Sequence, residues 1–257
     1  MTWAELHASY ASCPHLLLLP AALRDGEIKQ IASYRSQSRL PAVTWVHPLT
    51  RASLSRCAQP LVGLNRKRSE LDEKLVTLLR LVNPANPRVL HILDARPWKA
   101  AVGNTAMGKG FENIAHYDGA TLQFCSIDNI HAIRNSLSRL TELCSYGDSA
   151  SAGSGSSSFY ATNSGAAASA AAAQSTFLSS ASSAALAFDE TFLSKLEGSL
   201  WMHYVRLVLA AAQKIAVALS EEGASCITHC SDGSDKRNRT QRQHACIWAQ
   251  CGVGESC

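Results

Sequence analysis

The stretch Ala224-Ser-Cys-Ile-Thr-His-Cys-Ser-Asp-Gly233 decides how the rest of the chain is interpreted. Residues 224–228 form a short apolar run that fits a buried strand, and Gly223 just before it is typical of a helix end. A cysteine, small residues and then basic residues follow this run. Successive backbone N–H groups in such a loop can all point at one oxyanion, so we expect a phosphate-binding loop here.

Cys230 is the candidate nucleophile of this loop. A free cysteine titrates near ~8.5, whereas thiolates at helix N-termini or beside cations titrate at roughly 3.5 to 7.5. The expected chemistry is transfer of a phosphoryl group to sulfur followed by hydrolysis of the phosphocysteine, with a carboxylic acid protonating the departing alkoxide. Asp232 and Asp235 are the local acids.

An arginine is expected opposite the acid, because a planar guanidinium can hold two equatorial phosphate oxygens at once. Lys236, Arg237 and Arg239 compete for that role. The residues expected to line the bound phosphate are Ser231, Asp232, Gly233, Ser234, Lys236 and Arg237.

Two other interpretations of the segment stay open. In one of them, the cysteine is an inert core thiol and the basic run is a solvated turn. A zinc site is the other, because seven potential ligands crowd the end of the chain: Cys226, His229, Cys230, His244, Cys246, Cys251 and Cys257. Against zinc, no pair shows the Cys-x-x-Cys spacing of zinc ribbons, and strand alternation turns Cys226 and His229 to opposite faces.

The residues upstream of the loop predict an α/β fold with a central sheet flanked by helices. Short β-like runs at residues 42–46, 89–95 and 121–127 alternate with helical patterns. One long helix is expected over residues 189–219, and another over 129–144.

The pattern of residues 69–81 predicts an amphipathic surface helix. Four leucines recur at helical spacing on one side. The remaining charged side chains, Glu70, Asp72, Glu73 and Lys74, are expected to face solvent.

Composition narrows the function classes. With 46% hydrophobic residues in 257, the chain can bury a large core, and a net charge of +4 is too small to indicate a nucleic-acid partner. Nine scattered cysteines without a leading signal segment suggest reduced thiols in the cytoplasm. The apolar run at residues 200–219 contains His203, Arg206, Gln213 and Lys214, and so is not interpreted as a membrane span.

Domain boundaries follow from a change in composition. Residues 1–147 form the first part of one domain, and residues 148–188, rich in Ser, Ala and Gly, are expected to be a disordered insertion. Residues 189–240 return to the same domain with helix, strand and phosphate loop. Residues 241–257 are a divergent tail.

Seven blocks of the chain add to the evidence of the loop from His229 to Gly233: residues 38–48, 59–63, 67–74, 94–97, 108–113, 129–134 and 196–201. In this order they resemble segments of the catalytic domain of the myotubularin family of phosphoinositide 3-phosphatases. The loop itself resembles the start of the family signature, which continues Trp-Asp-Arg-Thr, and the chain offers Ser234-Asp235 and Arg239-Thr240.

This resemblance implies a fold like that of protein tyrosine phosphatases, without a cofactor or metal. It implies removal of the 3-phosphate from phosphatidylinositol 3-phosphate and phosphatidylinositol 3,5-bisphosphate. The implied roles are nucleophile for Cys230, acid for Asp235 and phosphate-holding arginine for Arg239. The partners implied are phosphoinositides at a membrane surface or another myotubularin-family protein, and the expected location is cytoplasmic, peripheral at endosomal-type membranes.

The sequence departs from the family pattern inside the loop. The family arginine should stand six positions after the cysteine, where this chain has Lys236, and Ser234 replaces a tryptophan. Either residues 236–238 are an insertion, about 10 Å of chain that bulges out before Arg239, or Lys236 replaces the arginine as a point charge. Because the match stops after Thr240, we expect a fragment lacking the family's C-terminal helix and N-terminal domain. The alternative to an enzyme is an inactive relative that binds lipid or pairs with an active one.

For lipid contact, the basic residues in family-like blocks are Arg96, Lys109 and Arg134. Asp94 and Arg96 are expected instead to form a structural pair near the end of a strand.

Overall fold

The computed structural model describes residues 2–5, 16–151 and 190–232. The chain divides into two compact units, one made of residues 1–130 and 205–257 and the other of residues 131–204.

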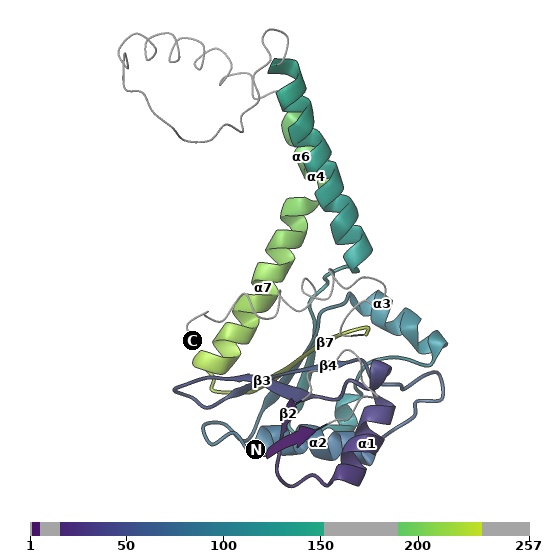
Figure 1. The fold of residues 1–257 in the computed structure, drawn as a ribbon, viewed down its shortest axis with the longest axis vertical. Helices are drawn as coiled ribbons and strands as arrows, with labels where there is room; N and C mark the ends of the chain where they lie inside the picture. Colours follow the sequence, from purple (N-terminus) through teal and green to yellow (C-terminus); the bar gives the residue numbers. More distant parts are fainter. Residues whose placement is uncertain (1, 6–15, 152–189, 233–257) are drawn as a thin grey trace, which may run out of the picture. The chain divides into compact units, whose positions relative to one another are not determined.

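A mixed sheet forms the centre of the first unit (Figure 1). Within the described residues it has seven strands in the order β1-β2-β3-β4-β7-β5-β6. In chain order these are β1 (Thr2–Glu5), β2 (Leu16–Leu19), β3 (Ala42–Val46), β4 (Ser53–Ala58), β5 (Leu90–Asp94), β6 (Ala120–Phe124) and β7 (Ser225–Cys230). Strands β1 to β4 pair antiparallel, whereas β4, β7, β5 and β6 pair parallel. Strand β7 therefore lies between two parallel neighbours, β4 and β5.

Helices cover both faces of this sheet. Helices α1 (Asp25–Tyr34) and α2 (Glu70–Leu81) bury Ile31 and Leu75 against Ile92 and Ile227. On the opposite face, the part of α7 (Trp201–Ser220) that belongs to this unit buries Leu219 in a second cluster. Each fully buried aliphatic side chain contributes roughly 1.5 to 3 kcal/mol. The sheet is thus fixed from both sides, which holds the carboxyl ends of its parallel strands in place.

Three short helical segments lie near that carboxyl edge: η1 (Ser36–Ser38), α3 (Trp98–Gly103) and η2 (Asn104–Met107). A fourth, η3 (Ile114–His116), instead precedes the amino end of β6. The left-handed Gly223, with φ of 62°, turns the chain from the end of α7 into β7.

The second unit contains most of α4 (Ile130–Ser151), all of α6 (Glu190–Ser199) and the first turn of α7. Helix α4 continues past the expected insertion boundary at residue 148. The insertion's remaining residues, 152–188, lie outside the described residues.

The expectation of one long helix over residues 189–219 is wrong. Leu200 adopts a left-handed backbone conformation with φ of 63° and separates α6 from α7. The hydroxyl of Ser199 explains the break locally, because it donates to the carbonyl of Leu196 and accepts from the N–H of Trp201.

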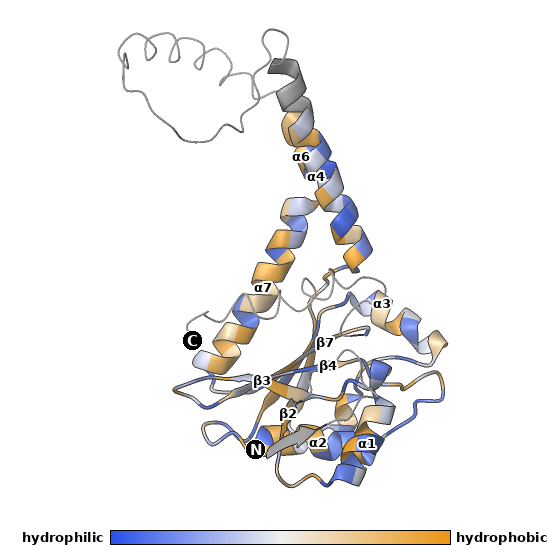
Figure 2. Cartoon of the chain, viewed as in Figure 1, coloured by the Kyte–Doolittle hydropathy of each residue, from blue (hydrophilic) through white to orange (hydrophobic). Residues whose placement is uncertain are grey.

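Helix α7 has the length and composition of a membrane-spanning helix, and it is the one described helix that does. Figure 2 shows apolar residues along most of its length. However, Val208, Ile215 and Leu219 are buried, and Ile215 and Leu219 belong to the core cluster on the sheet. Residues 205–220 of α7 thus contribute to the core, while only 22% of the helix's apolar window is buried.

The expected α/β architecture is confirmed. Residues 42–46, 89–95 and 121–127 each contain or overlap a strand, and β7 runs two residues further than predicted. The helix predicted over residues 69–81 forms, with Ser69 accepting from the N–H of Asp72 as its N-cap. Its solvent face was predicted correctly for Glu70 and Lys74, which are exposed. It was predicted wrongly for Asp72 and Glu73, which are buried and ion-paired to Arg35 and Arg68.

Candidate active site

The candidate site lies at the carboxyl edge of the parallel strands. Cys230 is the last residue of β7, and its carbonyl accepts from the N–H of Gln59 at 3.1 Å, just after β4. On the other side, the N–H of Ala95 donates to the carbonyl of His229 at 2.8 Å. Both neighbouring strands thus hold the backbone that leads into the loop. The carboxyl ends of parallel strands are the usual place for ligands in α/β proteins.

The first two loop residues are held by side chains from distant segments. The Asp232 carboxylate accepts from the hydroxyl of Ser36 at 2.6 Å and from the ammonium of Lys109 at 3.1 Å. Arg39 donates to the carbonyl of Asp232, and Asn104 donates to the hydroxyl of Ser231 at 3.4 Å. Partial burial alone would raise the pKa of Asp232, but these contacts outweigh it and lower the pKa. Asp232 is therefore an anion at neutral pH and suits loop positioning better than proton donation.

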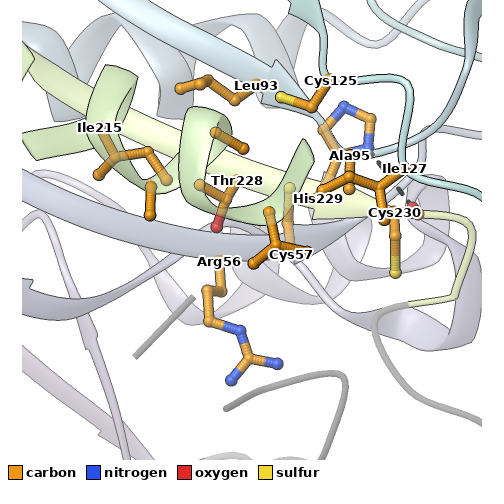
Figure 3. A pocket seen from close by; sticks show the side chains of 13 residues that line it. Arg56, Cys57, Leu93, Ala95, Cys125, Ile127, Ile215, Thr228, His229 and Cys230 are labelled. Carbon is orange, nitrogen blue, oxygen red and sulfur yellow. Dashed lines mark hydrogen bonds between the residues drawn. The ribbon is translucent and has the colours of Figure 1, made fainter. Parts of the chain in front are cut away.

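A pocket of about 100 Å³ opens beside Cys230, between the sheet and α7 (Figure 3). Its lining is mostly apolar and includes Leu93, Ile127, Val208 and Ile215. Because a phosphate group loses hydrogen bonds with water and gains few in such surroundings, we do not assign it as the phosphate site. The pocket does leave Cys230 partly exposed.

His229 lies on the other face of β7 from this sulfur. Figure 3 shows its ring and the Cys230 side chain pointing in opposite directions. Nε2 of His229 lies 3.0 Å from the Glu112 carboxylate, and both side chains are fully buried. Burial alone would lower the pKa of His229, but the charge of Glu112 outweighs it and raises the pKa.

Other thiols near the site differ from Cys230 in burial. Cys57 and Cys125 line the same pocket, and Cys226 lies further back on β7. Burial raises the pKa of all three, to about 12 for Cys226, where Glu222 adds to the effect. These three cysteines are therefore protonated core thiols at neutral pH.

The structure places part of the predicted site. Cys230, Ser231 and Asp232 lie together at the sheet edge, as predicted. The other candidates, Gly233, Ser234, Asp235, Lys236, Arg237 and Arg239, lie outside the described residues.

The structural pair of Asp94 and Arg96 is confirmed, with Nη2 2.6 Å from the carboxylate. Of the other basic residues considered for lipid contact, Lys109 binds Asp232 and Arg134 lies in the second unit.

Several residues around the loop were not found from the sequence. Ser36, Arg39 and Asn104 come from connecting segments with no periodic pattern. Glu112 lies in one of the family-like blocks, at residues 108–113, but nothing local linked it to His229. Long-range hydrogen bonds assemble this group, and only the fold reveals them.

The zinc interpretation gains no support here. Cys226 packs in the cluster with α7 while His229 faces Glu112, so the expected opposite orientation is confirmed. In the described part of the chain, no three potential metal ligands lie together. The remaining residues of that interpretation, His244, Cys246, Cys251 and Cys257, lie outside it.

Comparison with known proteins agrees with this geometry. The sequence pattern of the myotubularin-like phosphatase domain matches residues 3–242. The chain belongs to the myotubularin-like phosphatase family. It is 34% identical to the phosphatidylinositol-3,5-bisphosphate 3-phosphatase of Mus musculus over 236 residues, which is 90% of this chain and 30% of the relative.

Two further relatives match over a similar share of this chain. The phosphatidylinositol-3-phosphatase myotubularin-1 of Arabidopsis thaliana is 37% identical over 91% of this chain and 27% of its own length. Myotubularin of Xenopus laevis is 31% identical over 90% of the chain and 32% of its own length. The chain thus spans about a third of the length of these relatives.

Proposed function

We propose that this myotubularin-family chain hydrolyses the 3-phosphate of phosphatidylinositol 3-phosphate and phosphatidylinositol 3,5-bisphosphate through a phosphocysteine on Cys230. The observation that carries the proposal is the position of Cys230 at the end of β7, between two parallel strands and partly exposed. The relatives named as 3-phosphatases support the choice of substrate.

The proposed reaction has two steps. The Cys230 thiolate attacks phosphorus, the bond between phosphorus and the inositol 3-oxygen breaks, and Asp235 gives its proton to that oxygen. Water then gives a proton to the Asp235 carboxylate and attacks the phosphocysteine, which breaks the bond between sulfur and phosphorus and releases inorganic phosphate with the thiolate restored. Arg239, or Lys236 in its place, would neutralise the phosphoryl oxygens. Four side chains hydrogen-bond to Ser231 and Asp232. These contacts support a loop that already has its shape before substrate binds.

The direct test is release of phosphate from phosphatidylinositol 3-phosphate in vesicles by the 257-residue chain. We expect release by the wild type, a background rate for Cys230→Ser, and wild-type release for Cys144→Ser, which removes an exposed thiol on α4. Equal, background-level release by the wild type and Cys230→Ser would overturn the proposal.

A second candidate is a non-catalytic relative that binds phosphoinositides or pairs with an active family member. Lys236 favours it, because it stands where the family signature has its arginine. Losing a bidentate transition-state contact typically costs a hundredfold or more in rate. Binding of the wild type to phosphatidylinositol 3-phosphate vesicles without phosphate release would favour this candidate. Binding to neither vesicles nor an active myotubularin would exclude it.

The proposed location in the cell is inferred from the proposed lipid substrate. We propose that the chain acts at the cytoplasmic face of endosomal-type membranes. Expression of a fluorescent fusion tests this, since it should colocalise with a probe for phosphatidylinositol 3-phosphate. Uniform distribution that does not respond to depletion of that lipid would contradict it.

A further inference from the structure

Exposed apolar side chains gather on the segments that follow β4 and β5. These two strands flank β7, so the connections that leave their carboxyl ends lie next to the loop that begins at Cys230. The turn after β4 carries Leu64, while α3 and η2 after β5 carry Trp98, Val102 and Met107. Leu64, Trp98 and Met107 are between 56% and 73% exposed, and Val102 is exposed as well. Four large apolar side chains thus remain in water next to the candidate site.

These four residues, which we call the rim patch, belong to one surface because their backbones are joined. The N–H of Gly63 donates to the carbonyl of Lys109 at 3.0 Å. A Cβ at Gly63, which is left-handed with φ of 63°, would lie only 3.2 Å from Cα of Gly108. The backbone at Leu64 is therefore close to that at Met107. Helix α3 runs directly into η2, so the other members of the rim patch follow on a single segment.

The same segment is attached to the phosphate loop. Asn104 in η2 donates to the hydroxyl of Ser231 at 3.4 Å, and Lys109 binds the carboxylate of Asp232 at 3.1 Å. Figure 1 shows α3 beside the end of β7. A surface that contacts the rim patch is therefore held next to Cys230.

The charges around the rim patch are mainly positive. Residues 60–69 and 97–111 contain no Asp or Glu, and the next carboxylate along the chain, Glu70, begins α2. Arg66 and Lys67 are exposed in the turn after β4. Neither side chain forms an ion pair with another described residue. These two cations are therefore available to an anionic partner.

We propose that the rim patch, together with Arg66 and Lys67, docks on an anionic lipid bilayer and presents the lipid headgroup to Cys230. This inference rests on the proposed function, because it takes the substrate to be a lipid whose acyl chains stay in the bilayer. Apolar side chains enter the boundary between headgroups and acyl chains, and neighbouring cations attract anionic headgroups. Tryptophan is enriched at that boundary. The sheet edge that carries the nucleophile then faces the membrane.

A bilayer fits this surface better than a protein partner does. The cores of protein interfaces are depleted of charged residues, lysine among them. Here Arg66 and Lys67 lie in the same short turn as Leu64, so apolar contact brings both cations to the partner as well. An anionic bilayer receives the two kinds of side chain together, because its headgroups lie directly above its apolar interior.

The first experiment measures co-sedimentation of the 257-residue chain with phosphatidylcholine vesicles that contain about 20% phosphatidylserine and no phosphoinositide. The wild type should bind, and Leu64→Ala combined with Trp98→Ala should bind about tenfold more weakly, because less apolar area leaves water. The control is Leu49→Ala, at an exposed position before β4 and so at the opposite edge of the sheet. Equal binding by all three proteins, or no binding by the wild type, would overturn the proposal.

The same assay tests the two cations. Each cation near an anionic leaflet strengthens binding about fivefold, so Arg66→Ala combined with Lys67→Ala should weaken it by about tenfold or more. Added salt should weaken wild-type binding in the same direction, because it screens these charges. Arg88→Ala, an exposed cation before β5 at the opposite edge, is the control and should bind as the wild type does. Wild-type binding by the double variant would contradict the electrostatic part of the proposal.

The second experiment asks whether Trp98 enters the bilayer. Phosphatidylcholine with brominated acyl chains quenches the fluorescence of tryptophans that reach those chains. We expect such vesicles to quench the wild type. Trp98→Phe keeps an aromatic side chain, so it should bind as the wild type does but lose most of the quenching. Undiminished quenching in Trp98→Phe would overturn the proposal.

Four outcomes separate this proposal from the proposed function. Binding and quenching as expected, without phosphate release from any phosphoinositide, would support docking and contradict the proposed function. Phosphate release from vesicles that is unchanged by Leu64→Ala with Trp98→Ala would overturn docking alone. A wild-type dimer in ultracentrifugation that binds no vesicles, and that Trp98→Ala dissociates, would identify a protein interface and overturn docking. If the double alanine variant does not fold, the comparison of wild type with Trp98→Phe decides.

Discussion

At the scale of single residues, the described thiols around the site differ chiefly in their surroundings. Cys57 and Cys226 are buried, and desolvation raises the pKa of each. Cys230 is partly exposed at the end of its strand, next to His229 and the cavity. The same chemical group is therefore inert at two positions and available at the third.

The first prediction is selective alkylation. At pH 7 in the folded chain, iodoacetamide should modify Cys230 while Cys57 and Cys226 stay unmodified, because both remain protonated and shielded. Mass spectrometry of the tryptic peptides measures this. In urea all three should react, which serves as the positive control. Modification of Cys57 as fast as Cys230 under native conditions would refute the distinction.

The second prediction concerns Lys109. Lys109→Met removes the ammonium that holds Asp232, so we expect kcat to fall about tenfold, or ~1.4 kcal/mol in barrier, with little change in KM. Lys109→Arg should retain most of the rate. The control is Lys99→Met, at an exposed position on α3. If Lys109→Met keeps the wild-type kcat, the ion pair between Lys109 and Asp232 has no role in turnover.

At the scale of elements, β7 contributes both to the hydrophobic core and to the candidate active site. Its inward residue Ile227 is 1% exposed and packs in the cluster beneath α1 and α2. The same strand ends in Cys230. Packing in the middle of this strand therefore fixes the backbone from which the loop begins.

The third prediction follows from that packing. Ile227→Ala should lower the free energy of unfolding by about 2 to 5 kcal/mol, because it removes a buried side chain and leaves a cavity. Urea denaturation measures the loss. Leu209→Ala, at a position 64% exposed on α7, should change stability by less than about 0.5 kcal/mol. Equal effects of the two changes would mean that β7 is not part of the core.

Elements whose apolar residues recur at a regular spacing could be predicted from the sequence, whereas a strand that buries polar side chains could not. Strand β3 and helix α2 follow clear patterns. Strand β4 contains two buried serines, and Ser53 pairs with Ser225 across the sheet at 3.2 Å. Such a strand lacks the apolar alternation that marks a half-buried strand, so it was missed.

The candidate site was predictable only in part for a related reason. Cys230, Ser231 and Asp232 form one contiguous segment, so composition and the strand before them sufficed. Asp72 was expected to face solvent because helical patterns assign charged residues outward. Its burial depends on Arg35, 37 residues earlier in the chain, and a single sequence does not reveal that partner.

At the scale of the whole molecule, the buried charges make stability depend on pH. Burial alone would raise the pKa of Glu112, but the charges of His229 and Arg35 hold it far below its ordinary value of 4.5. Its contribution is therefore present above about pH 4.5 and lost as the pH falls below that. His229 has a pKa raised above its ordinary value of 6.5. Its contribution is complete below 6.5 and lost as the pH rises through the raised value.

The fourth prediction combines the opposite pH dependences of these two contributions to stability. The difference in unfolding free energy between wild type and Glu112→Gln should be largest between about pH 4.5 and 6.5 and should shrink on both sides. Urea denaturation at several pH values measures it. Glu222→Gln, at the surface, should differ from wild type by less than about 1 kcal/mol throughout. A difference that grows steadily above pH 6.5 would contradict the assigned charge of His229.

The covalent intermediate tests the central claim most directly. The chain is mixed with phosphatidylinositol 3-phosphate carrying a radiolabelled 3-phosphate, quenched in acid, and digested for peptide mapping. Cys230 should carry the label in the wild type, and Cys230→Ser should carry none. Phosphate release without label on Cys230, or label on another residue, would contradict the account.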